Sequence, residues 1–204
     1  MGFEKRCVIM ATIMQTNIYD LIITGAGASG LMAAQEAGRL GLKVLVLEGK
    51  ASAGAKILMS GGTRCNVTNA FVSEKDYMSE YPRLVRHVLQ AFRPEETVLF
   101  FEDRGVHLRR EEDGKYFPES DSAKDVLKAL LGAVKDAGVT VQYEALVRKV
   151  ENGGGLWHVS GEDFEHKAKV ILIATGGLSY PGTGTNGFGY KIARIFGTKA
   201  SVIS

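Results

Sequence analysis

The residues best suited to chemistry in this sequence lie at positions 25–30, which have the sequence GAGASG. If this segment joins a strand to a helix, Gly25 permits a tight turn and Gly27 lets the backbone approach a pyrophosphate. Gly30 then lets the helix pack close to the strand. The first turn of such a helix offers unpaired N–H groups and a partial positive charge to phosphate oxygens. The predicted phosphate-binding residues are Gly25, Ala26, Gly27, Ala28, Ser29 and Gly30.

An acidic residue, Glu48, lies eighteen positions after Gly30. In dinucleotide-binding units an acid about 20 residues further on binds the ribose of the adenosine. A carboxylate here can accept hydrogen bonds from both ribose hydroxyls, and it would repel the 2′-phosphate of NADP. The combination predicts a site for the ADP part of a dinucleotide other than NADP.

The surrounding sequence predicts the elements that would position these residues. Apolar residues 19–24 and 43–47 predict two core strands, and residues 31–40 predict a helix that Gly41 ends. A glycine-rich turn without a ligand is the alternative, since GxGxxG alone is a weak signal. The strand, helix, second strand and terminal acid together favour the nucleotide site.

The composition limits the remaining possibilities. A chain of 204 residues with 45% hydrophobic residues has room for one large domain, or one and a fraction. The net charge of +2 gives no support for nucleic-acid binding. Two cysteines cannot form a disulfide framework, which favours a cytoplasmic protein, and no apolar run is long enough to span a membrane. Residues 1–17 are predicted to be a disordered extension.

The middle of the chain predicts a long loop followed by mixed structure. Residues 49–69 lack periodicity, and a loop of this length in a compact domain is usually functional or disordered. Ser122 is predicted to cap a helix, with Asp125 completing an approximate capping box and Gly138 ending the helix. Further elements are predicted as helices at 84–92 and 94–103, a hairpin of 106–110 and 115–117 around Asp113 and Gly114, and a core strand at 139–143.

Three short alternating segments then precede an apolar run. Residues 145–150, 156–159 and 164–169 predict an antiparallel meander. Residues 170–174 predict a buried parallel strand. A crossover made of a three-stranded meander is unusual in NAD dehydrogenases and typical of FAD-binding Rossmann domains of the glutathione-reductase-like class, a point that rests on fold analogy.

Three further motifs carry a family resemblance. Residues 56–69, KILMSGGTRCNVTN, resemble the K-x-x-x-S-G-G-G-R-C-N-x-T-N signature of the BaiN/YhiN-like flavoproteins, also called the aminoacetone-oxidase family. Residues 117–126 resemble the F-P-x-S-x-x-A-x-x-V pattern of that family, and residues 174–181 resemble its A-T-G-G-x-S-Y-P. With the dinucleotide motif, the resemblance covers residues 18–198.

The resemblance implies FAD as cofactor, a Rossmann-type α/β fold, and redox chemistry on a small-molecule substrate. It implies that the loop 60–66 passes near the flavin and pyrophosphate, and that the backbone of Val147 binds adenine. The implied cofactor-binding residues beyond the GAGASG segment are Glu48, Lys56, Ser60, Gly61, Gly62, Arg64, Cys65, Asn66, Val147, Ala174, Thr175 and Gly176. No catalytic residue is assigned, and no metal site is predicted.

The sequence departs from the family pattern at several points. Thr63 replaces a glycine, and if this position needs a positive φ, a β-branched residue is strained there. Phe188 replaces an acid and Thr198 replaces a histidine. Family members continue into an inserted substrate domain, so we expect residues 18–198 to be a partial FAD domain and residues 199–204 to begin the missing part. That missing domain, or a separate chain carrying it, is the expected partner.

Several residues keep two interpretations at this stage. Cys65 is either a redox thiol beside the flavin or, as we prefer, a buried thiol that packs against the cofactor. Arg64 either pairs with phosphate or flavin, or ties the loop to a carboxylate. Lys56 either contacts the cofactor or anchors the loop, and Tyr180–Pro181 either faces the flavin or forms a structural turn. Phe92, Phe100 and Phe101 are predicted to be core residues.

The sequence therefore predicts the N-terminal FAD-binding part of an oxidoreductase that transfers hydride between flavin and a small molecule. One alternative is a NAD-dependent dehydrogenase domain. A second is a non-catalytic remnant or cofactor-binding subunit that needs a partner chain.

Overall fold

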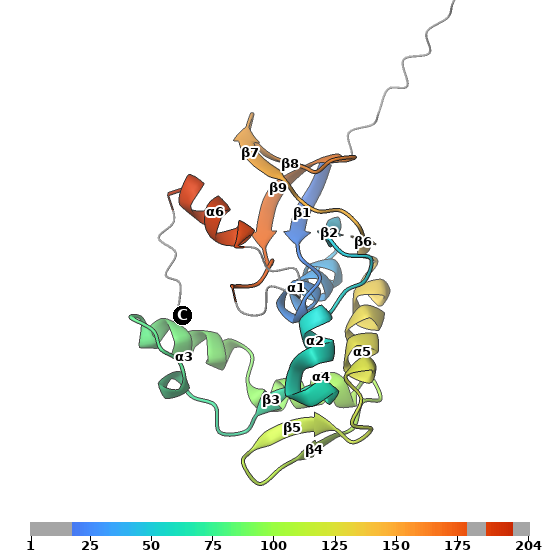
Figure 1. Ribbon diagram of the computed structural model, residues 1–204, viewed down its shortest axis with the longest axis vertical. Helices are drawn as coiled ribbons and strands as arrows, with labels where there is room; N and C mark the ends of the chain where they lie inside the picture. Colours follow the sequence, from blue (N-terminus) through green and yellow to red (C-terminus); the bar gives the residue numbers. More distant parts are fainter. Residues whose placement is uncertain (1–17, 179–186, 198–204) are drawn as a thin grey trace, which may run out of the picture.

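The computed structural model describes residues 18–178 and 187–197 (Figure 1). Its strands are β1 (Ile18–Thr24), β2 (Val44–Leu47), β3 (Thr68–Asn69), β4 (Leu108–Arg110), β5 (Lys115–Pro118), β6 (Thr140–Gln142), β7 (Lys149–Gly153), β8 (Leu156–Ser160) and β9 (Glu165–Ile173). Its helices are α1 (Ala28–Arg39), α2 (Ala55–Met59), η1 (Ser60–Thr63), η2 (Glu74–Asp76), α3 (Pro82–Ala91), α4 (Pro94–Glu102), α5 (Ala123–Asp136) and α6 (Phe188–Ile195). The predictions for residues 1–17, Tyr180–Pro181 and Thr198 lie outside the described residues.

The main sheet has six strands in the order β6-β2-β1-β9-β8-β7. Strands β6, β2, β1 and β9 run parallel, and β9, β8 and β7 are antiparallel. This confirms the predicted Rossmann-type α/β fold with a meander as the crossover into β9. The apolar run of β2 is buried along its whole length, as expected for a parallel strand covered on both faces.

Two hydrophobic clusters cover the two faces of this sheet. Helices α1 and α5 pack on one face, where Ile23 and Val46 meet Leu31 and Leu130. On the other face Ile22 and Leu45 lie in a cluster with residues of the meander and α6. Alternate residues of β1 and β2 therefore belong to different clusters, as the side-chain period of a strand requires.

The observed strand β9 differs from two predictions. Residues 164–169 and 170–174 were expected to be separate strands, but Glu165–Ile173 is one continuous strand that pairs with β8 along its first part and with β1 beyond it. The apolar run was also expected to be buried. Val170 is 54% exposed and Leu172 is 37% exposed, because α1 and α5 cover β1, β2 and β6 and leave this face of β9 open (Figure 1).

A second, smaller layer lies below the main sheet in Figure 1. It contains a three-stranded antiparallel sheet in the order β3-β5-β4, together with α2 and α4. The hairpin between β4 and β5 turns at Gly114, whose φ is +84° and whose N–H donates to Glu111 O, which confirms the predicted turn. Helix α3 stands apart from the body and contains no buried residue.

The capping box predicted at the start of α5 is wrong. Ser122 occupies the N-cap position, but its side chain makes no capping hydrogen bond. Asp125 instead accepts a hydrogen bond from the hydroxyl of Ser120 at 2.6 Å. The helix still ends as predicted, because Gly138 adopts φ +70° and its N–H donates to Lys135 O.

Among the described residues, no helix combines the length and the apolar composition that crossing a bilayer would require.

Candidate dinucleotide-binding site

A cavity of about 1010 Å³ opens at the carboxyl ends of β1, β2 and β9. This is the edge at which open α/β sheets bind their ligands. Most residues predicted from the sequence to bind the cofactor line it. They are Gly25, Ala26, Gly27, Ala28, Ser29, Glu48, Lys56, Ser60, Cys65, Asn66, Val147, Ala174, Thr175 and Gly176. Gly30, Gly61, Gly62 and Arg64 are not among the lining residues.

The three glycines of the first turn have distinct structural roles. Gly25 has φ +102°, and a Cβ there would lie 2.5 Å from the carbonyl oxygen of Ala174. A Cβ on Gly30 would lie 2.0 Å from the carbonyl oxygen of Gly25, so this residue is needed for packing although it does not touch the cavity. Gly27 has open space around it and forms the N-cap of α1. Only Gly27 is therefore free of structural constraint and available for close approach by a ligand.

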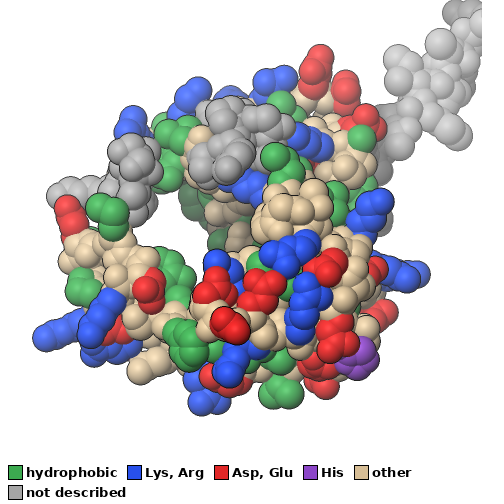
Figure 2. All heavy atoms as spheres, turned by 60° about the horizontal axis from the view of Figure 1, so that its bottom comes forward, with side chains coloured by type: hydrophobic (Ala, Val, Ile, Leu, Met, Phe, Trp, Pro, Cys, Tyr) green, Lys and Arg blue, Asp and Glu red, His purple; other side chains and the backbone are tan. Residues whose placement is uncertain are grey.

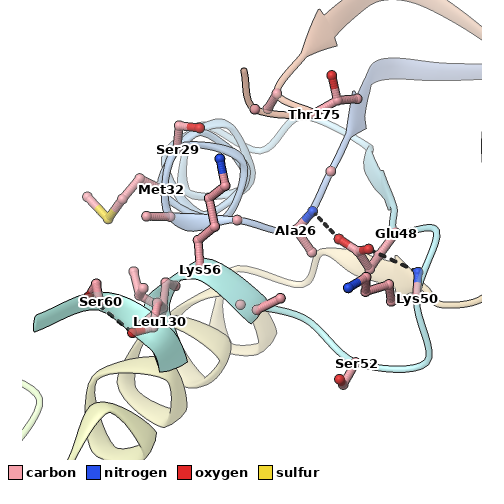
Figure 3. A pocket seen from close by; sticks show the side chains of 18 of the residues that line it. Ala26, Ser29, Met32, Glu48, Lys50, Ser52, Lys56, Ser60, Leu130 and Thr175 are labelled. Carbon is pink, nitrogen blue, oxygen red and sulfur yellow. Dashed lines mark hydrogen bonds between the residues drawn. The ribbon is translucent and has the colours of Figure 1, made fainter. Parts of the chain in front are cut away.

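The carboxylate of Glu48 lies between two backbone N–H groups (Figure 3). Ala26 N donates to Oε2 at 2.8 Å, and Lys50 N donates to Oε1 at 3.0 Å. These bonds fix the carboxylate beside the first turn of α1, where it lines the cavity. Each carboxylate oxygen has more than one lone pair, so the group keeps the capacity to accept further hydrogen bonds.

The segment that follows β6 borders Glu48 on its other side. Ala145 N donates to Glu48 O at 2.8 Å, and Leu146 lies so close that a Cβ on Gly49 would meet its side chain at 2.9 Å. Val147 is 6% exposed and lines the cavity. The structure thus brings Val147 and Glu48, which are far apart in the sequence, into the lining of one cavity.

Residues after β9 close the cavity on a third side. Ala174 N donates to Thr24 O at 2.9 Å, which extends the pairing of β9 with β1 up to the glycine turn. Gly176 follows with φ +76°. Because Ala174 O lies against Gly25, the turn after β9 and the turn after β1 fit together as one unit.

The loop 60–66 takes an unusual backbone path. Gly61 and Gly62 have positive φ, as do Thr63 at +73° and Cys65 at +66°. The strain predicted for a threonine at position 63 is therefore present, since β-branched residues rarely adopt this conformation. Cys65 is buried, and burial raises the pKa of its thiol, with a Ser60 hydrogen bond opposing the shift. A thiol held protonated in this way matches the packing role rather than the redox role.

The structure decides between the two interpretations of Arg64. Its Nη1 lies 2.8 Å from Glu111 Oε1 and 3.8 Å from Asp121 Oδ1. Its guanidinium lies over the ring of Phe117, 4.0 Å from the ring centroid. Arg64 therefore ties the loop to carboxylates and points away from the cavity. Lys56 differs, because it lines the cavity and extends from α2 toward the first turn of α1 (Figure 3).

Sequence reasoning missed much of the apolar wall of the cavity. Phe92, predicted to be a core residue, is 43% exposed and lines the cavity instead. Phe100 and Phe101 are buried as predicted, but they also line the cavity. The other missed residues include Met32, Thr97, Val126, Leu130, Leu146 and Phe188. Helical periodicity marks such side chains as apolar but does not indicate whether they face a ligand or a neighbouring helix.

The family model of the HI0933-like protein Rossmann domain matches residues 19–203 of this sequence. The chain belongs to this family. The HI0933-like chain is 34% identical over 179 residues to the "Ribosomal RNA dihydrouridine synthase" of Escherichia coli (strain K12), covering 88% of this chain and 44% of the relative. It is 35% identical over 187 residues to the "3-dehydro-bile acid delta(4,6)-reductase" of Clostridium scindens, covering 89% of this chain and 44% of that relative.

A solved structure gives the same fold. The structure of Thermovibrio ammonificans THI4 is 18% identical, with a TM-score of 0.55, over 89% of the HI0933-like chain and 64% of the THI4 chain. At this identity the similarity supports the fold alone. The chain spans about half the length of the curated relatives it matches.

Proposed function

We propose that this HI0933-like chain is the FAD-binding part of a BaiN/YhiN-like oxidoreductase that exchanges hydride between flavin and a small-molecule substrate. The observation that carries the proposal is the cavity at the carboxyl edge of the sheet, which Gly27, Glu48 and Lys56 all line. The helix N-terminus and Lys56 suit a pyrophosphate, and Glu48 suits ribose hydroxyls. The residues present therefore fit the ADP part of FAD.

The volume of the cavity, about 1010 Å³, and its lining favour FAD over a simple mononucleotide. Glu48 and Val147 line the cavity, and they would hold adenosine. Cys65, Phe92 and Phe101 line it as well, and such a mainly apolar wall suits a planar ring system. We propose that a dinucleotide lies with its pyrophosphate at the first turn of α1, its adenosine toward Glu48 and its flavin toward the apolar wall.

Bound FAD would supply a site that accepts or donates hydride. The protein would hold the ADP part in place, exclude water with the apolar wall, and keep Cys65 protonated by burial. The names of two relatives suggest a substrate class. Dihydrouridine is uridine with its 5,6 double bond reduced, and a delta(4,6)-reductase acts on carbon–carbon double bonds. The double bond of uridine is conjugated to a carbonyl group, as are double bonds at positions 4 and 6 of a 3-dehydro bile acid, so we propose compounds with such a conjugated double bond as candidate substrates.

A titration of the purified chain with FAD tests the proposal. Binding should quench or shift the flavin fluorescence, and ADP should compete because it occupies the same cradle. NAD, which carries the same ADP part but no flavin ring system, should bind more weakly than FAD. Failure of FAD to bind, while NAD binds, would favour a NAD-dependent dehydrogenase domain instead.

A second candidate function is a cofactor-binding subunit that acts with a partner domain or chain. The exposed apolar residues Val170, Leu172 and Ile195 favour it, because apolar surface of this kind commonly marks an interface. Under this proposal the chain binds FAD but shows no oxidoreductase activity until the partner is added. Activity of the isolated chain with a conjugated carbonyl substrate would argue against it.

A further inference from the structure

We infer that Arg64 is a positioning residue that holds the cavity-lining residues Cys65 and Asn66 in place by clamping their loop to the hairpin β4–β5. The inference rests on the proposed function, because it takes the cavity to be the flavin site. Arg64 itself does not line the cavity. Its effect on a bound ligand would therefore pass through the backbone of the loop.

Three groups from the hairpin and the residues after it hold the Arg64 guanidinium. Glu111 accepts its hydrogen bond at 2.8 Å, and Asp121 lies 3.8 Å away. The ring of Phe117 stacks against the guanidinium at 4.0 Å. Asp121 also pairs with Arg109, so the two arginines share this carboxylate. Figure 2 shows charged side chains of both signs crowded together on the face that carries the hairpin.

The loop needs such an external clamp because its own backbone conformation is unfavourable. Thr63 and Cys65, the residues on either side of Arg64, both have positive φ, which side chains with a Cβ rarely adopt. Conformations of this kind persist only when the surrounding structure enforces them. Arg64 lies between these two residues and is the side chain that reaches across to the hairpin.

The same aromatic ring links the clamp to the start of the loop. A Cβ on Gly61 would lie 2.8 Å from the ring of Phe117, so Gly61 packs directly on the ring that also carries Arg64. At the other end, Val67 N donates to Tyr116 O at 2.9 Å. Strand β5 therefore contacts the loop at its beginning, its middle and its end, and Arg64 supplies the middle contact.

The clamp has a direct consequence at the cavity. Cys65 N donates to Ser60 O at 3.0 Å, which closes the loop on itself, and Cys65 and Asn66 both line the cavity. Loss of the Arg64–Glu111 pair would leave the strained residues without this support. We expect the loop to open more often, which exposes the Cys65 thiol and removes one wall of the flavin site.

Two measurements on the full chain test the inference. All proteins carry Cys7→Ser, so that Cys65 is the single thiol. The rate of Cys65 modification by a thiol reagent is measured without ligand, and the FAD dissociation constant is measured by fluorescence. The variants are Arg64→Met, Glu111→Gln and their double mutant, with Arg64→Lys as the conservative change. Arg86→Met is the matched control, because it removes an arginine–glutamate pair between α3 and η2 and no cavity residue.

The inference predicts faster Cys65 modification in Arg64→Met and Glu111→Gln, with FAD binding weakened about tenfold, which corresponds to 1.4 kcal/mol. The double mutant should be no worse than Arg64→Met alone, since Arg64→Met already removes the ion pair with Glu111 together with the contacts to Asp121 and Phe117. Arg64→Lys should recover part of the effect, and the visible circular dichroism of the bound flavin should change only where binding weakens. Arg86→Met should match the parent.

The outcomes separate this inference from the proposed function. Unchanged Cys65 reactivity and unchanged FAD affinity in both single mutants would overturn the positioning role. Faster modification of Cys65 in a chain that never binds FAD would support the clamp and contradict the proposed function. If Arg64→Met fails to fold, Glu111→Gln, which changes charge with almost no change in volume, gives the same test.

Discussion

The backbone N–H of Ala26 lies 2.8 Å from the Glu48 carboxylate, so the turn after β1 and the end of β2 are joined by a hydrogen bond. Ala26 is fully buried, and its N–H has this carboxylate as its acceptor. Glu48 therefore has a structural role in the protein without ligand as well as the proposed role toward ribose. The two roles can be separated by experiment.

Replacing Glu48 with alanine should affect both stability and binding. The Ala26 N–H would lose its acceptor, which costs about 1–3 kcal/mol for a buried donor. Loss of the hydrogen bonds to ribose should weaken FAD binding roughly 10- to 100-fold. Thermal unfolding and FAD titration measure the two effects. Glu162→Ala, which removes an exposed acid between β8 and β9, is the control, and equal behaviour of the two variants would contradict the assignment.

Alanine substitutions at Gly27 and Gly30 should act on different properties: Gly30→Ala on stability and Gly27→Ala on FAD binding. Gly30→Ala places a Cβ 2.0 Å from a backbone oxygen and should destabilise the protein by about 3 kcal/mol. Gly27→Ala meets no atom within 4 Å and should cost about 1 kcal/mol or less. It should nevertheless weaken FAD binding, because the methyl group lies where the pyrophosphate would approach. Chemical unfolding and FAD titration of both variants check this, and a stable Gly30→Ala protein would be the contrary result.

The stability of the protein should depend on pH through His166. Its ring packs between Tyr19 and Phe164, and burial lowers its pKa below the ordinary value. The unfolded chain then binds the proton more readily, so stability is lost as the pH falls through about 6.5. The midpoint of thermal unfolding between pH 7.5 and 5 measures the effect, and His166→Gln should reduce the slope.

His107 serves as the control, because its pKa is shifted in the opposite direction to that of His166. Its hydrogen bond with Glu102 raises its pKa, so its contribution to stability is present at low pH and is lost as the pH rises through its folded pKa. His107→Gln should leave the acid-side loss of stability in place. If His166→Gln and His107→Gln change the profile in the same direction, the assignment to His166 is wrong.

The open face of β9 should promote self-association of the chain. Val170 and Leu172 are exposed on this strand, and Ile195 and Phe196 are exposed at the end of α6. Size-exclusion chromatography at increasing concentration should show oligomers or aggregates. The double substitution Val170→Thr and Leu172→Thr should shift the protein toward the monomer with little loss of stability. A monodisperse, flavin-loaded monomer of the parent chain would contradict the expectation.

Many features of the site could be predicted from the sequence because they depend on neighbouring residues. The turns at Gly25 and Gly114 follow from conformations that glycine alone adopts easily, and the close packing at Gly30 follows from its lack of a Cβ. The strain at Thr63 could likewise be predicted from a β-branched residue in a glycine position. The meander and the position of Glu48 followed from periodicity and spacing along the chain.

Other features depended on which distant residues the fold brings together. The partner of Arg64 is Glu111, 47 positions away, and no local pattern selects this carboxylate over a ligand phosphate. The same holds for Asp125, which was expected to pair with Ser122 and is instead hydrogen-bonded to Ser120. It also holds for Phe92, which was expected in the core and instead lines the cavity.

The sequence by itself thus determined the glycine turn, the acid that faces it and the succession of strands and helices along the chain. Backbone conformation and side-chain periodicity are encoded within a few neighbouring residues, so these features need no tertiary contact. The tertiary structure alone decided which charged groups pair, which apolar residues line the cavity and which face of β9 stays open. The physical reason is that hydrogen bonds, ion pairs and burial depend on distances between segments, and these are set only when the sheet and its helices pack.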